Sequence, residues 1–147
     1  MIKILNDSNI FDSNHSILVN PVNCVGVMGA GLAKQFSVRY PGLLASHKNY
    51  CDSGVIKPGI LHFFRVDSYL RILNFPTKDH WKNPSEIEYV EKGLDKIIEC
   101  YQHKRISSIA FPILGGGLGG LDKEIVLNLM IEKLKKIEEE VEIEIYN

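Results

Sequence analysis

The sequence predicts a single α/β domain in which a largely parallel or mixed sheet lies between layers of helices. Short runs rich in β-branched and aromatic residues alternate with segments of helical periodicity along most of the chain. Two of these runs lead through a glycine-rich loop into a helical segment, a connection typical of α/β folds. The length of 147 residues, with 45% hydrophobic, suits one core and one domain spanning residues 1–147.

Six short apolar runs with high β-propensity are predicted to form the strands. The predicted strands span residues 2–5, 17–19, 60–66, 70–75, 108–113 and 141–146. The acidic run at residues 138–144 is interpreted as a solvated helix end and strand face.

The most regular helical pattern follows Pro84. Apolar residues recur there with a period near 3.6 over residues 87–101, and Ser85 with Glu88 fits a capping box. The sequence therefore predicts a helix that begins just after Pro84 and buries one face.

Three further helices are predicted. One should begin at Asp122 as its N-cap and continue to residue 137, with lysines near the end that the helix dipole makes negative. Two shorter helices should span residues 30–38 and 41–51, and Pro41 suits the first turn of the second one.

The charge balance excludes a protein that coats nucleic acid. The chain carries 17 basic and 18 acidic residues, which gives a net charge of −1. The charges are uneven, because residues 1–82 hold nine basic and five acidic residues, whereas residues 83–147 hold eight and thirteen. A local basic surface on the N-terminal half therefore remains compatible with the composition.

The cysteine pattern and the lack of a long apolar stretch point to the cytoplasm. Cys24, Cys51 and Cys100 are odd in number and form no C-x-x-C pair, so neither a disulfide framework nor a zinc site is expected. No stretch approaches the roughly 20 apolar residues of a membrane span, and no signal peptide is recognisable. We expect a cytoplasmic protein without a bound metal or a membrane partner.

A glycine-containing segment follows the second predicted strand. Residues 19–31 read VNPVNCVGVMGAG and lead into a helix. Glycines let backbone N–H groups approach a ligand, and a helix N-terminus favours an anion such as a diphosphate. The segment lacks the Gly-Lys-Ser/Thr of a Walker A loop, and its G-x-x-G-x-G spacing differs from the dinucleotide-binding pattern. A turn without any ligand is the simpler alternative.

A second passage of strand, glycine loop and helix occurs at residues 111–122, which read FPILGGGLGGLD. Five glycines in the six positions 115–120 exceed what a turn needs. Ligands of α/β proteins collect at the carboxyl ends of the strands, where both loops should lie. Two such loops can hold one diphosphate from both sides.

Between these loops, residues 74–82 carry Lys78, His80 and Trp81 after a predicted strand. A lysine close to apolar groups and other cations can act as a nucleophile toward a masked aldehyde such as C1 of a ribose. The alternative is that Lys78 is an ordinary surface cation, that Trp81 plugs a loop and that His80 packs or caps.

Together these segments resemble the macrodomain family. The resemblance is carried by NPVN at residues 20–23 with the following glycine loop, by NFPTK at residues 74–78 and by residues 115–122, and it covers nearly the whole chain. Within the family, the sequence is most similar to the branch of the terminal ADP-ribose glycohydrolase and the DarG-type antitoxin macrodomain, which removes ADP-ribose from thymidine bases of DNA. The stretch Phe-Pro-Thr-Lys-x-His-Trp is typical of the DarG type.

The resemblance implies a three-layer α/β/α sandwich with a mixed central sheet and with ADP-ribose, rather than a cofactor, in a cleft over the strand ends. Lys78 matches the catalytic lysine of the family and Asp122 its partner acid, although Asp122 also suits an ordinary N-cap. Asn23 should contact the distal ribose, and the glycine loops should hold the diphosphate. The other residues expected to bind ADP-ribose are Asn9, Val27, Met28, Gly29, Ala30, Gly31, Thr77, Gly115, Gly116, Gly117, Leu118, Gly119 and Tyr146.

The chain departs from the family pattern near the predicted adenine site. The family usually carries an Asp there, whereas this chain has Asn9, whose carbonyl still accepts a hydrogen bond but carries no charge. Asp7 is an alternative acceptor. Tyr146 lies where aromatic residues approach adenine, with a core or edge position as the alternative. Lys123 stands where DarG-type proteins tend to have Trp.

The function that the resemblance implies is a metal-independent ADP-ribosyl hydrolase, with ADP-ribosylated thymidine in DNA as the expected substrate. A rim formed by Lys34, Arg39, Lys78 and Lys82 would contact the DNA. A phosphatase acting on ADP-ribose 1″-phosphate and a non-catalytic ADP-ribose-binding module are the alternatives, although a pure binding module needs neither Lys78 nor Asp122. A monomer is expected, and 147 residues leave no room for the further region of the DarG-type antitoxin.

Overall fold

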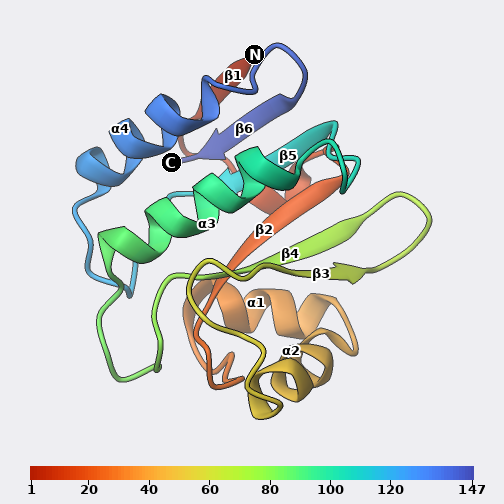
Figure 1. Ribbon diagram of the computed structural model, residues 1–147, viewed down its shortest axis with the longest axis vertical. Coiled ribbons are helices and arrows are strands. Elements are labelled where there is room, and N and C mark those ends of the chain that lie inside the picture. The colour runs from red at the N-terminus through yellow and green to blue at the C-terminus, as the bar shows by residue number, and fades with distance from the viewer.

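The computed structural model describes residues 1–147 and contains a six-stranded sheet between two pairs of helices (Figure 1). In chain order the elements are β1 (Ile2–Leu5), the 3-10 helix η1 (Ile10–Asp12), β2 (Ile17–Val22), α1 (Gly31–Arg39), α2 (Leu43–Asp52), β3 (His62–Arg65), β4 (Arg71–Pro76), α3 (Ile87–Cys100), β5 (Ser108–Pro112), α4 (Lys123–Leu134) and β6 (Glu142–Tyr146). The strand order is β1-β6-β5-β2-β4-β3, and only the β3–β4 pair is antiparallel. The predicted α/β fold with a mixed sheet is confirmed.

The two faces of the sheet bury alternate side chains. In β2, Ile17 and Val19 belong to the core beneath α3 and α4, whereas Leu18 and Val22 belong to the core beneath α1. This alternation is the two-residue period of a strand covered on both faces. Figure 1 shows α3 and α4 on one side of the sheet and α1 and α2 on the other, which makes three layers. None of the helices combines the length and the apolar character needed to cross a membrane.

Several predicted boundaries are wrong for reasons of pairing. β2 continues to Val22, past Asn20 and Pro21, because its whole length pairs in register with β4. β3 and β5 are shorter than predicted, and α4 ends at Leu134, after which turns continue toward the last strand. Apolar content alone could not locate these ends, since hydrogen-bond partners from distant segments decide them.

The predicted caps are right at one helix and wrong at two. Asp122 does cap α4, since its Oδ1 accepts from the N–H groups of Glu124 and Ile125 at 3.0 and 3.1 Å. The predicted capping box of α3 is absent, because Ser85 donates its hydroxyl to Thr77 instead.

Pro41 does not occupy the first turn of α2. That helix begins at Leu43, and its N-cap is Gly42, with a φ of 88° that favours glycine. The proline therefore lies just before the helix, in the turn that leads from α1 into α2.

A line of buried polar side chains crosses the sheet from β2 to α2. The Asn20 amide donates to Asn74 Oδ1 at 3.0 Å, and the Asn74 amide contacts His62 Nδ1 at 3.1 Å. On its other side, His62 Nε2 lies 3.2 Å from the Ser46 hydroxyl. Burial, together with the neighbouring His47 ring, lowers the pKa of His62 to about 4. His62 is therefore neutral at physiological pH and can accept from Asn74.

The buried His62 makes stability depend on pH. Because its pKa is about 4 in the folded state and 6.5 when unperturbed, the unfolded chain binds more protons between these values, and the free energy of unfolding should fall as pH drops from 6.5 to 4. We expect His62→Gln to reduce the fall in urea midpoint between pH 7.5 and pH 5. His103→Gln, which changes an exposed histidine, is the control. Its urea midpoint should fall as much between pH 7.5 and pH 5 as that of the wild type. An equal loss in His62→Gln would contradict this assignment.

Gly93 allows α3 to pack closely on β4. A Cβ at this position would lie 2.1 Å from Cζ of the buried Phe75 ring. Gly93→Ala should lower the free energy of unfolding by about 1–3 kcal/mol, because overpacking outweighs the gain in helix propensity. Lys92→Ala, at the exposed neighbouring position, should stay within about 0.5 kcal/mol of the wild type in the same denaturant titration. An unchanged midpoint for Gly93→Ala would show that the Phe75 ring moves aside.

Candidate functional site

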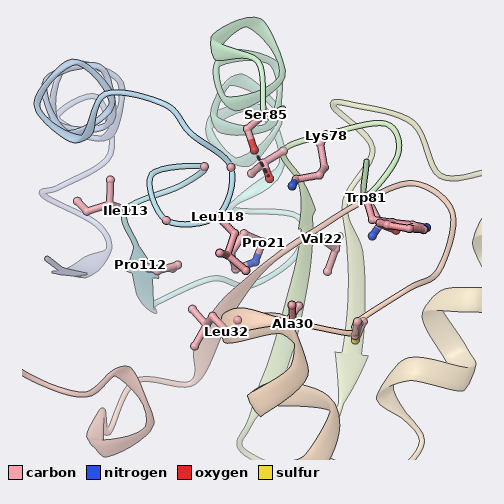
Figure 2. A pocket seen from close by; sticks show the side chains of 18 of the residues that line it. Pro21, Val22, Ala30, Leu32, Lys78, Trp81, Ser85, Pro112, Ile113 and Leu118 are labelled. Atoms are coloured by element: carbon pink, nitrogen blue, oxygen red, sulfur yellow. Dashed lines mark hydrogen bonds between the residues drawn. The ribbon is translucent and has the colours of Figure 1, made fainter. Parts of the chain in front are cut away.

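A cavity of about 810 Å³ lies at the carboxyl ends of β2, β4 and β5 (Figure 2). Parts of the segments 21–33, 77–85 and 112–119 line it, together with Lys123 at the start of α4 and Tyr146 and Asn147 at the end of β6. Small-molecule sites typically measure about 300–1,000 Å³, so the cavity is large enough for a nucleotide-sized ligand.

The cavity opens because β2 and β5 separate. β2 pairs with β4 from Ile17 to Val22, but it pairs with β5 only at Ile17 and Leu18. Pro21 offers no N–H group for further pairing. The chain passes from β2 to the β3–β4 side of the sheet and returns to β5 on the other side, so the loops after β2 and β5 diverge. Figure 2 shows Pro21 and Val22 on one side of the resulting gap and Pro112 and Ile113 on the other.

Asn23 organises the first loop. Its side-chain carbonyl accepts from the N–H groups of Val25, Gly26 and Val27 at 3.1–3.3 Å, and its amide donates to the Val27 carbonyl at 2.8 Å. The residue is 6% exposed. Asn23 lines the cavity as expected, but the contacts in the structure are those of a residue that shapes the loop.

The N-terminus of α1 faces the cavity without a cap. Its N-cap is Ala30, which has no side-chain acceptor, and Gly31, Leu32 and Ala33 of the first turn all line the cavity. Their N–H groups have no partner within the helix, and the helix dipole adds positive potential at this end. By contrast, Asp122 fills the equivalent position of α4. The first turn of α1 is therefore a potential anion-binding site.

The second loop is held against the segment that carries Lys78. The Ser85 N–H donates to the Gly119 carbonyl at 3.0 Å, and the Ser85 hydroxyl donates to Thr77 Oγ1 at 3.3 Å. A Cβ on Gly119 would lie 2.3 Å from Ser85 Oγ and 2.6 Å from the Gly115 carbonyl oxygen, so only glycine fits. Leu118 is 74% exposed and lies against Gly31, which brings the two glycine loops together across the cavity.

Lys78 follows β4 on a loop that is tied to the first glycine loop. The Thr77 N–H donates to the Val22 carbonyl at 2.9 Å, and the Cys24 N–H donates to the Asp79 carbonyl at 3.1 Å. These bonds continue the β2–β4 pairing past the ends of the strands. Lys78 is half-buried, and Figure 2 shows its amine directed into the cavity.

The cavity is electropositive although the chain has a net charge of −1. Its only charged lining residues are Lys78 and Lys123, and no Asp or Glu lines it. The nearby Cys24 is a poor nucleophile, because burial, Cys51 and Asp79 raise the pKa of its thiol to about 12. The candidate nucleophiles of the cavity are therefore the amines of Lys78 and Lys123, of which Lys78 follows β4 directly. No group of three or more His, Cys, Asp or Glu side chains is placed to hold a metal ion.

Most of the predicted binding residues line this cavity, and three do not. The lining includes Asn23, Val27, Met28, Gly29, Ala30, Gly31, Thr77, Lys78, Gly115, Gly117, Leu118, Gly119 and Tyr146. Gly116 lies outside it, and Asn9 Oδ1 accepts from the Phe11 N–H to begin η1. Asp122 also lies outside, and no ion pair joins it to Lys78.

The sequence pattern does not identify Ser85 and Trp81 as residues that line the cavity, whereas Lys123 lies in the wall where the resemblance implies a departure from the DarG type. Ser85 was assigned to a helix cap because it precedes an apolar run. Trp81 is 51% exposed and is not a buried plug, contrary to one of the alternatives. Ser85 and Trp81 both follow β4 on the segment that carries Lys78, and this position is the signal that could have identified them.

Sequence comparisons agree with this architecture. The Macro domain family model matches residues 19–130. A Mycobacterium tuberculosis protein named DNA ADP-ribosyl glycohydrolase is 40% identical over 123 residues, which are 82% of this chain and 35% of the relative. A Thermus aquaticus protein of the same name is 38% identical over 133 residues, with 88% and 37% covered. The chain thus spans about a third of the length of these curated relatives.

Solved structures agree as well. The macrodomain of Mycobacterium tuberculosis DarG superposes with a TM-score of 0.93 at 36% identity, covering 99% of this chain and 97% of that one. The macrodomain of Thermus aquaticus DarG gives 0.92 at 37% identity, covering 100% and 98%. The structure of Thermosipho africanus DarTG in complex with ADP-ribose gives 0.90 at 36% identity, covering 98% of this chain and 41% of that one. The resemblance drawn from the sequence is confirmed, and the chain belongs to the macrodomain family.

Proposed function

We propose that this macrodomain binds ADP-ribose and hydrolyses the bond that joins it to a thymidine base of DNA. The name of the relatives, DNA ADP-ribosyl glycohydrolase, supports this reaction, as does the complex of Thermosipho africanus DarTG with ADP-ribose. The observation that carries the proposal is the position of Lys78 in an electropositive cavity next to the uncapped first turn of α1.

The first turn of α1 and the second glycine loop suit a diphosphate. The unpaired N–H groups of Gly31, Leu32 and Ala33 provide donors on one side, and the loop backbone around Gly117 provides donors on the other. No side chain fills the space beside Gly117, since a Cβ there would meet nothing within 4 Å. A negatively charged ligand meets no Asp or Glu side chain among the lining residues.

The strand order orients the ligand. Tyr146 ends β6 and Lys78 follows β4, and β5 and β2 lie between these two strands. Three spacings of about 4.8 Å put β6 and β4 roughly 14 Å apart where the sheet is continuous, and the separation of β2 from β5 widens this span at the cavity. An extended ADP-ribose matches this span, with its adenine near Tyr146, its diphosphate between the glycine loops and its distal ribose near Lys78.

Lys78 supplies the chemistry in this arrangement. Its amine, once the ammonium has lost one proton, attacks C1 of the distal ribose while the bond from C1 to the base breaks. The proton that the newly bonded nitrogen then loses leaves with the base. Water then releases ADP-ribose from the lysine and restores the amine. Asp122 lies outside the cavity and forms no ion pair with Lys78, so a water would have to carry the proton of the Lys78 ammonium to its free Oδ2.

Lys78 variants test the nucleophile. We expect Lys78→Ala to reduce release of ADP-ribose from an ADP-ribosylated thymidine oligonucleotide by about 10²–10⁴-fold in single-turnover assays. Lys78→Arg should be equally slow, because arginine keeps the charge but stays protonated.

Lys57→Ala, which removes an exposed lysine outside the cavity, is the matched control and should react like the wild type. Activity retained in Lys78→Arg would contradict nucleophilic attack by the lysine. It would indicate instead that the positive charge at this position stabilises the transition state. Phosphate release from ADP-ribose 1″-phosphate that is independent of Lys78 would favour a phosphatase, and tight ADP-ribose binding without turnover of the oligonucleotide would favour a binding module.

Asp122 variants separate its two roles. Asp122→Asn retains a good N-cap acceptor but cannot take up a proton, so it should keep wild-type stability and lose release activity by at least about tenfold. Asp122→Ala should also lower the free energy of unfolding by about 1 kcal/mol, measured by denaturant titration, because the cap is lost. Full activity in Asp122→Asn would leave Asp122 as a cap alone.

The three cysteines are all free thiols, as is usual in a reducing compartment. This supports placing the proposed activity in the cytoplasm.

A further inference from the structure

Trp81 is an aromatic side chain that the core does not use. It is the only tryptophan of the chain, it is 51% exposed, and it belongs to neither hydrophobic core. Yet it lines the cavity, three residues after Lys78 on the same loop, and Figure 2 shows both residues on the same side of the cavity. A large ring at the mouth of a cavity suggests contact with a ligand that has a planar group.

The loop holds the Trp81 ring in a defined position. The Asp79 carboxylate accepts from the His80 N–H at 2.7 Å and from the Asn83 amide at 2.9 Å, and the Lys82 N–H donates to His80 Nδ1 at 3.1 Å. The His80 ring lies 5.3 Å from the Trp81 ring, centroid to centroid. These hydrogen bonds close the turn around Trp81, so its backbone is ordered before a ligand binds, and the His80 ring lies beside the indole.

A cation accompanies the ring. Lys82 Nζ lies 5.1 Å from the centroid of the Trp81 ring. An indole beside a lysine amine is typical of surfaces that bind single-stranded nucleic acid. A base can stack on the ring while the ammonium contacts a phosphate. Lys82 lies outside the cavity lining, as does the Asp79 carboxylate of the same loop, which accepts from the His80 N–H and the Asn83 amide.

The position relative to Lys78 identifies which part of a substrate would reach Trp81. The glycine loops and Tyr146 account for the ADP-ribose side of the scissile bond. The group that leaves C1 must then lie beyond Lys78, and Trp81 is the exposed ring on that loop. We propose that Trp81 is the stacking platform for the departing nucleobase, with Lys82 at the adjoining phosphate, and that this pair makes the site selective for DNA adducts. The inference rests on the proposed function.

Variants of Trp81 test the platform. Trp81→Ala should lower kcat/KM for the ADP-ribosylated oligonucleotide by about 5- to 150-fold, the equivalent of the ~1–3 kcal/mol that stacking of one base contributes. The loss should appear mainly in KM, Trp81→Phe should recover most of it, and the calorimetric Kd for free ADP-ribose should stay within about twofold of the wild type. An unchanged Kd also shows that the cavity is folded.

Tyr69→Ala is the matched control. Tyr69 is an aromatic residue of similar exposure, 59%, but it precedes β4 at the end of the sheet opposite the cavity. This variant should cleave the oligonucleotide like the wild type.

The fluorescence of Trp81 gives a direct readout, because no other tryptophan emits. In the Lys78→Ala background, the modified oligonucleotide should quench this emission more strongly than free ADP-ribose does. Equal quenching by both ligands, or wild-type kcat/KM in Trp81→Ala, would overturn the platform. Failure of the wild type to release ADP-ribose from the oligonucleotide would instead overturn the proposed function, so the two failures are distinguishable.

Discussion

The separation of β2 from β5 after two paired residues is the constraint on which the other features of the site depend. Where the two strands separate, the loops that follow them must diverge, and the backbone groups at their ends become available to a ligand. The continued pairing of β2 with β4 has the opposite effect, because it extends into the bonds between Thr77 and Val22 and between Asp79 and Cys24. The separation of β2 from β5 thus opens the cavity, whereas its pairing with β4 fixes Lys78 at the cavity wall.

Local electrostatics at this site differ from those of the whole chain. A net charge of −1 gives no general attraction to phosphate, yet the cavity contains two lysines, no Asp or Glu side chain and an uncapped helix start. Most of the acidic residues lie in the second half of the chain, many on the exposed faces of α3 and β6. Recognition of a single anionic adduct requires only that the potential be positive where the adduct sits.

The fold class, most strands and the glycine loops could be predicted because they depend on local composition and periodicity. The roles of residues that depend on distant partners could not be predicted in this way. Ser85 precedes a helix, but its hydroxyl and amide bind Thr77 and Gly119, a contact that no local pattern contains. Asn23 has a second role that no local pattern contains, because its carbonyl and amide organise its own loop, and its contact with a ribose stays a prediction.

The contact of Ser85 with Gly119 also links the two ends of the cavity energetically. Gly119 cannot shift without displacing Ser85, and Ser85 is hydrogen-bonded to Thr77, the residue before Lys78. Free energy gained where a ligand meets the glycine loop can therefore help to order the loop that carries Lys78, since these two hydrogen bonds join the loops. A ligand lacking the group that fills the glycine loop would then encounter a less ordered lysine. Contacts with the glycine loop would in this way decide how fast Lys78 reacts with a given ligand.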